Sequence, residues 1–139
     1  MHWAERTALV AAAFLALASP AQAETLKFAA MLAGDEADAQ RLGDARGNVS
    51  FTLDTASKAL SWTIEYSGLA QPPDAVRCGM LESQTGPALV ITGDMKSPIN
   101  GSKTIGDVDV GALSAGRWVC VLGTSGDAAE LGGEVRPAR

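Results

Sequence analysis

The two cysteines, Cys78 and Cys120, are the residues of this 139-residue chain that could carry the most distinctive chemistry. Each lies in a short apolar stretch, DAVRCGMLE at 74–82 and GRWVCVLG at 116–123. The pair could be a structural disulfide, two buried thiols, a redox-active pair or part of a metal site. The spacing is not Cys-x-x-Cys, and two thiolates alone rarely hold a metal ion. We therefore predict a structural Cys78–Cys120 disulfide.

The strands that carry the cysteines should direct both sulfurs into the core. Each cysteine has apolar neighbours two positions away on the same strand face: Val76 and Met80 for Cys78, and Trp118 and Leu122 for Cys120. Side chains alternate across a strand, so these neighbours share the face of the cysteine. The bond would close a loop of about 43 residues, which the chain-entropy estimate values at roughly 4 kcal/mol.

An oxidising compartment is indicated by the first 23 residues. Arg6 precedes an apolar run at 7–18, and Ala21-Gln22-Ala23 forms a small-residue cleavage site. This pattern predicts a signal peptide at 1–23 and one domain at 24–139, exported to the periplasm or secreted. The apolar run is shorter than the roughly 20 residues of a membrane span. We expect no integral membrane span in the mature chain.

The one histidine, His2, lies in the predicted leader. A mature domain without histidine excludes Ser-His-Asp and Cys-His catalysis and histidine-ligated metals. We therefore predict a protein that is not an enzyme, with no catalytic residue, no metal and no cofactor. The net charge of −5 argues against a nucleic-acid or anionic-lipid partner and leaves an unknown protein or envelope component.

Period-2 alternation predicts strands over most of the domain. Residues 49–53 (VSFTL) and 60–66 (LSWTIEY) alternate, and the short polar link 54–59 joins them as a hairpin. Further strands are predicted at 26–32, 76–80, 89–91, 118–122 and 131–135. Residues 118–122 are apolar on both faces, which is typical of a central strand covered on both sides.

Glycine and proline residues separate these segments, and helical turns are predicted only at 35–44 and 110–114. Short strands with such turns favour an all-β fold. The predicted architecture is an antiparallel β-sandwich of about seven to eight strands, immunoglobulin-like or superoxide-dismutase-like, preceded by a signal peptide.

Several segments, in order, resemble the CHRD (chordin-like) domain family: LKFAAMLAGDE, GNVSFTLDTASKALSWTIEYSGLA, TGPALVI, LSAGRWVCVLGT and GGEVR. Gly68, Arg117 and Glu134 match residues of the family's motifs. The resemblance implies a sandwich-like domain outside the cytoplasm. In chordin such repeats belong to an extracellular protein that binds growth factors.

The chain departs from the family at three positions. The family typically carries a His-x-His pair and a third histidine, and these positions hold Val76, Cys78 and Leu122 here. The resemblance therefore identifies a divergent member without the family's histidines. We hypothesise that a polar inward site has been exchanged for apolar packing and a disulfide.

The remaining chemical candidates are interpreted as structural. The acids Asp35, Glu36, Asp38, Asp107 and Asp109 are predicted in solvated turns, the last two sharing a face if that stretch is extended. Glu134 is predicted to pair with Arg117 or Arg136 in a structural ion pair. Lys58, Lys96 and Lys103 are placed in surface turns, and Trp62 and Trp118 in the core.

The sequence thus predicts an exported, non-catalytic binding or structural module whose ligand the residues do not define. The alternative is a degenerate metal-handling or thiol-redox protein of the extracytoplasmic space.

Overall fold

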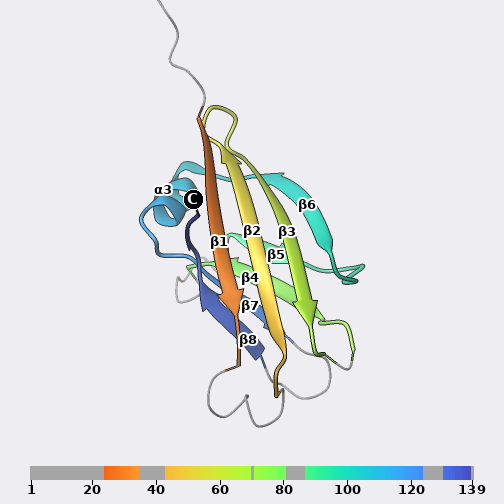
Figure 1. The fold of residues 1–139 in the computed structure, drawn as a ribbon. Coiled ribbons are helices and arrows are strands. Elements are labelled where there is room, and N and C mark those ends of the chain that lie inside the picture. Colours follow the sequence, from red (N-terminus) through yellow and green to blue (C-terminus); the bar gives the residue numbers. More distant parts are fainter. Residues whose placement is uncertain (1–23, 35–42, 70, 81–86, 124–129, 139) are drawn as a thin grey trace, which may run out of the picture.

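The computed structural model describes residues 24–34, 43–69, 71–80, 87–123 and 130–138. Two antiparallel sheets and one short helix make up this part of the chain (Figure 1). The five-stranded sheet has the order β6-β3-β2-β1-β9, and the four-stranded sheet has the order β5-β4-β7-β8. The element bounds are β1 Thr25–Leu32, β2 Arg46–Asp54, β3 Ala59–Ser67, β4 Ala75–Gly79, β5 Leu89–Ile91, β6 Ile99–Thr104, α3 Asp107–Ser114, β7 Val119–Gly123, β8 Glu130–Glu134 and β9 Arg136–Pro137.

The all-β, antiparallel sandwich predicted from the alternation is confirmed. The hairpin of β2 and β3 is present, with Leu53 opposite Leu60 next to the turn. The expected strands at 26–32, 76–80, 89–91, 118–122 and 131–135 correspond to β1, β4, β5, β7 and β8 within one or two residues. The predicted leader at 1–23 and residues 35–42 of the predicted helical turn at 35–44, with Asp35, Glu36 and Asp38, lie outside the described residues.

Two strands were not expected, so the described residues contain nine strands rather than seven to eight. Strand β6 has the sequence INGSKT, in which Ile99 alone is buried. Its position at an edge of the sheet explains the missing alternation, because neither face of its later residues packs into the core. Strand β9 is only two residues long.

The segment before β7 is helical, not extended. Helix α3 begins at Asp107 and includes the predicted turn at 110–114. The two acids Asp107 and Asp109 therefore lie in its first turn, where negative charge stabilises a helix, and they do not share a strand face. Ala112 and Leu113 are its buried residues.

The core lies between the inner faces of the two sheets, which Figure 1 shows as a front layer of β1, β2 and β3 and a back layer of β4, β5, β7 and β8. The ring of Phe51 on β2 meets that of Trp118 edge-on, with ring centroids 5.8 Å apart. This edge-to-face contact spans the sandwich and adds to the burial of two large side chains.

Strand β7 is covered less fully than predicted. Its inward residues Cys120 and Leu122 are completely buried, whereas Val119 and Val121 on the other face are half-buried. The expectation of cover on both sides is therefore wrong for the described part of the chain. The strand is nevertheless central, because it pairs with both β4 and β8.

The two sheets join along one side. The backbone N–H of Ala33, just after β1, donates to the carbonyl of Gly132 on β8 at 3.1 Å, and the reverse bond is 2.9 Å. A Cβ at Gly133 would lie 2.1 Å from the carbonyl oxygen of Met31, so only glycine permits this close approach. The other side of the sandwich has β6 and β5 as its edge strands.

Candidate functional site

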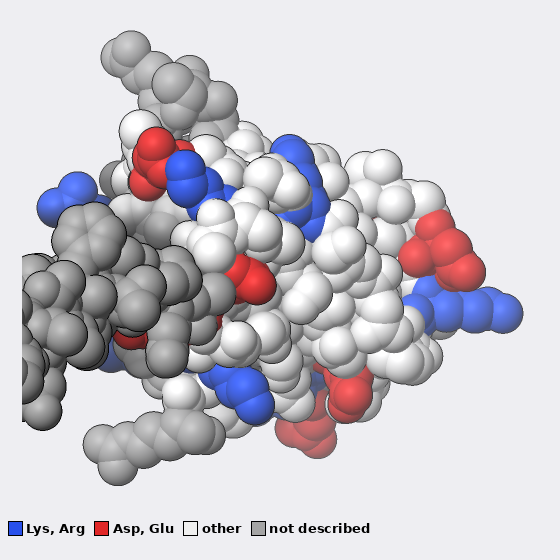
Figure 2. Space-filling model, turned by 90° about the horizontal axis from the view of Figure 1, so that it is seen from above, with Lys and Arg blue, Asp and Glu red and all other residues white. Residues whose placement is uncertain are grey.

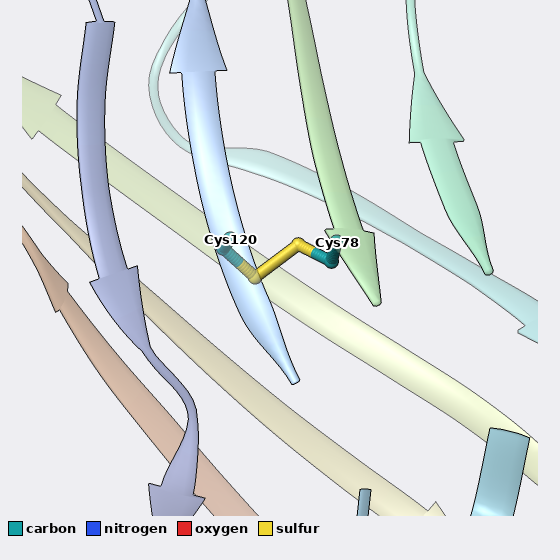
Figure 3. The surroundings of a disulfide bond; sticks show 2 residues. All are labelled: Cys78 and Cys120. Carbon is teal, nitrogen blue, oxygen red and sulfur yellow. A yellow bond between two sulfur atoms is a disulfide. The ribbon is translucent and has the colours of Figure 1, made fainter. Parts of the chain in front are cut away.

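The two cysteines lie directly opposite each other on neighbouring strands of the four-stranded sheet (Figure 3). Their sulfur atoms are 2.13 Å apart and their Cα atoms 4.1 Å apart, and the two residues form a disulfide. Both side chains have an exposed fraction of 0%. The predicted pairing and the predicted inward orientation are both present.

The three positions at which the resemblance implied histidines come together in the fold. Val76 on β4 is the cross-strand partner of Leu122 on β7, and Cys78 is two residues further along β4. All three are completely buried. Their apolar side chains and the bonded sulfur fill this part of the core. In the described part of the chain, no group of three or more His, Cys, Asp or Glu residues could hold a metal ion.

The residues that match the CHRD motifs occupy turns and the surface. Glu134 forms an exposed ion pair with Arg136, one of the two predicted partners. The Arg117 side chain is exposed, and its backbone N–H donates to the carbonyl of Ala112 at 3.0 Å. Gly68 directly follows β3 and has a φ of +81°, and a Cβ there would lie 2.9 Å from the Cα of Ala45. Gly68 is thus required by the backbone.

The predicted surface lysines differ in their positions. Lys58 lies in the β2–β3 turn and forms an ion pair with Asp107 of α3. Lys96 is exposed in the segment before β6. Lys103 lies on β6, so its placement in a turn is wrong, although its side chain is exposed as expected. Its Nζ is 3.5 Å from the carbonyl oxygen of Ala88.

The two tryptophans predicted in the core are buried to different extents. Trp118 is completely buried. Trp62 is half-buried at the β3–β6 boundary, where it packs against the core. Its indole covers Gly101 of β6 so closely that a Cβ at Gly101 would lie 2.6 Å from Trp62 Cζ2. The core prediction holds for Trp118 and in part for Trp62.

A groove of about 410 Å³ runs along β2, β3 and β6 and was missed by the sequence reasoning. The residues that line it are all uncharged: Ser50, Thr52, Ser61, Trp62, Thr63, Asn100, Gly101 and Ser102. The paired registers place Thr63 opposite both Ser50 and Asn100, on the outer face of the sheet. The Thr63 hydroxyl donates to Asn100 Oδ1 at 2.8 Å. We call this surface the hydroxyl groove.

The hydroxyl groove could have been inferred only in part. The polar positions of the alternating segments 49–53 and 60–66 are Ser50, Thr52, Ser61 and Thr63. A hydroxyl-rich outer face on the hairpin could therefore be predicted from the sequence. The contribution of Asn100 and Ser102 could not be predicted, because β6 shows no alternation of apolar and polar residues.

A second hollow, of about 390 Å³, lies between the start of β1, the end of α3 and β9. It is lined by Thr25, Leu26, Lys27, Phe28, Ser114, Pro137 and Ala138. On the face of the molecule seen in Figure 2, acidic and basic side chains are interspersed and do not form a patch of one sign. The second hollow includes Lys27, whereas the lining of the hydroxyl groove has no charged residue.

Comparison with known proteins finds no matching family model, no matching curated protein and no matching solved structure. The class that the fold itself defines is a disulfide-bonded antiparallel β-sandwich. None of the helices in the described residues is both long and apolar enough to cross a membrane.

Proposed function

We propose that this chain is an exported, non-catalytic binding or structural module that engages its partner through the hydroxyl groove. The groove carries the proposal because it gathers six hydroxyl or amide side chains from three neighbouring strands onto one exposed face. Strand positions are fixed by the ladder, so these groups are presented without the ordering cost that a loop would incur.

The chemistry of the groove supports an uncharged, hydrogen-bonding partner surface. Serine and threonine hydroxyls both donate and accept, and the Asn100 amide does the same. No lining residue is charged, although the whole chain carries a net charge of −5. Binding at this surface would therefore depend on hydrogen bonds and shape more than on ionic attraction, and it should change little with salt.

Export is supported by the leader pattern at 1–23 and by the buried Cys78–Cys120 pair. Disulfides persist in the periplasm and outside the cell and are rare in the cytosol. The CHRD resemblance, carried by the order of the motifs alone, agrees with an extracytoplasmic binding module. A thiol-redox role would need an accessible sulfur, and both sulfurs are completely buried.

The test is affinity capture by the purified protein from the native envelope and medium, with the captured components quantified by mass spectrometry. We expect at least one component to be retained by the wild type and lost with Thr63→Lys, which places a long charged side chain in the groove. The matched control, Val90→Lys, lies on the outer face of the other sheet. Capture that survives Thr63→Lys, or the absence of any captured component, would refute the proposal.

A further inference from the structure

The four sheet edges of the described residues are not equivalent. Strand β9 has two residues and β5 has three. The edge of β8 is joined to the end of β1 by the Ala33–Gly132 bridge. The remaining edge, β6, has six residues and no strand of the described chain beyond it. An exposed edge of this length is a template for pairing with another strand.

The ladder determines which groups of β6 point outward. The backbone N–H of Ile105 donates to the carbonyl of Lys58 at 3.0 Å. Hydrogen-bonded pairs alternate in an antiparallel ladder, so the groups of Gly101 and Lys103 also bond to β3. The backbone N–H and C=O groups of Asn100, Ser102 and Thr104 are therefore directed to the open edge.

We propose that β6 pairs antiparallel with β6 of a second copy of this chain, about a two-fold axis at Ser102. In this register Ser102 lies opposite Ser102 of the other copy, Asn100 opposite Thr104, and Gly101 opposite Lys103. The pairing joins the two five-stranded sheets edge to edge. An isologous contact of this kind closes as a dimer and does not extend into a filament.

Side chains on both faces of β6 suit this register. On the outer face the pairs are small and polar, Ser102 with Ser102 and Asn100 with Thr104, and cross-strand pairs of this kind are favourable. On the inner face Lys103 meets Gly101, which has no side chain to obstruct it. Trp62 covers that glycine. In the dimer the Lys103 ammonium leaves its 3.5 Å contact with the carbonyl oxygen of Ala88 and reaches the indole of the other copy, where a cation–π contact forms.

The start of β6 is held in place before any partner arrives. The hydroxyl of Tyr66 donates to the carbonyl of Met95 at 2.7 Å, and its backbone N–H donates to Ser97 Oγ at 3.2 Å. These bonds tie the segment before β6 to β3. An edge strand fixed in this way loses less conformational entropy on pairing.

The contact is small, because one strand edge buries less surface than the roughly 1,200–2,000 Å² of a standard stable interface. The dimer is therefore weak and dependent on concentration. The dimer goes beyond the proposed function and does not rest on it. The pairing is made by the backbone edge of β6, although Asn100 and Ser102 of this strand also line the hydroxyl groove.

Cysteine trapping tests the register directly. Under mild oxidation, Ser102→Cys should yield a covalent dimer, while Ser61→Cys, on the same outer face but on an inner strand, should remain monomeric. Asn100→Cys and Thr104→Cys should cross-link when mixed, and more slowly when each is alone. Trapping of Ser102→Cys no faster than Ser61→Cys would overturn the proposal.

Lysine on an edge strand is also a common barrier to pairing with another strand. The variant Lys103→Thr therefore shows whether Lys103 stabilises the dimer or prevents it. Measured by sedimentation equilibrium, the dimer dissociation constant should rise by about 3- to 10-fold when the cation–π contact is lost. Ser102→Pro removes an edge-directed N–H while sparing the bonds to β3, and it should abolish dimerisation. A tighter dimer with Lys103→Thr, or a wild type that stays monomeric at millimolar concentration, would overturn the proposal.

Discussion

Val76 and Leu122 are direct cross-strand partners on the buried face of the four-stranded sheet, one inward position along from the Cys78–Cys120 disulfide. These residues include all three positions at which the CHRD resemblance implied histidines. The fold thus brings these three positions together in the core. The side chains of Val76, Cys78 and Leu122 each have an exposed fraction of 0%. Apolar side chains and the disulfide fill this part of the core, and the replacement of a polar site by them stays a hypothesis.

Removing the disulfide should destabilise the domain substantially. Replacing both Cys78 and Cys120 by alanine releases a cross-link between residues 42 positions apart and leaves space in a packed core. We expect the free energy of unfolding to fall by about 2–5 kcal/mol, measured by urea denaturation. The double variant Ser102→Ala/Ser114→Ala, at exposed positions, is the control. A loss below about 1 kcal/mol would contradict a stabilising role for the disulfide.

The sulfurs should be inaccessible in the folded protein. Non-reduced, denatured protein should contain no free thiol, and mild reductant should release thiols only as the protein unfolds, because both cysteines are completely buried. A thiol-specific chromogenic reagent, with and without urea, measures this. Fast reduction of the folded protein would favour the thiol-redox alternative.

A histidine introduced at one of the three positions where the resemblance implied one should destabilise the domain. Leu122→His removes apolar contacts and buries an imidazole among apolar side chains, and we expect a loss of about 3–5 kcal/mol. Leu122→Met, which nearly conserves volume, should lose less than about 1.5 kcal/mol. Urea denaturation compares the two. Equal stabilities would show that the site tolerates a polar group.

Replacement of two glycines by alanine should change the stability of the domain in opposite directions. Gly68→Ala forces a side chain into a φ of +81° and against the backbone of Ala45, and should cost about 1–3 kcal/mol. Gly111 lies within α3, with no atom within 4 Å of an added Cβ, so Gly111→Ala should stabilise by about 0.5–1 kcal/mol. Thermal unfolding gives both signs, and a stabilised Gly68→Ala would contradict the assigned backbone requirement.

The sequence was most informative where one strand face is buried. The alternation at 49–53 and 60–66 predicted β2, β3 and their hairpin, and the matching positions of Cys78 and Cys120 predicted the disulfide. Strand β6 was missed because only Ile99 is buried, so no period marks it. Lys103 was consequently assigned to a turn. The hydroxyl groove was missed because its three strands are assembled by the sheet order, which local patterns do not encode.

The most direct test of the central claim is the affinity for a captured partner, measured by isothermal titration calorimetry for wild type, Thr63→Lys and Val90→Lys. If the hydroxyl groove is the binding surface, Thr63→Lys should weaken binding at least about 10-fold, which is roughly 1.4 kcal/mol. Val90→Lys, on the opposite sheet, should bind within about twofold of wild type. Unchanged affinity with Thr63→Lys and a loss with Val90→Lys would contradict the account and move the binding surface to the four-stranded sheet.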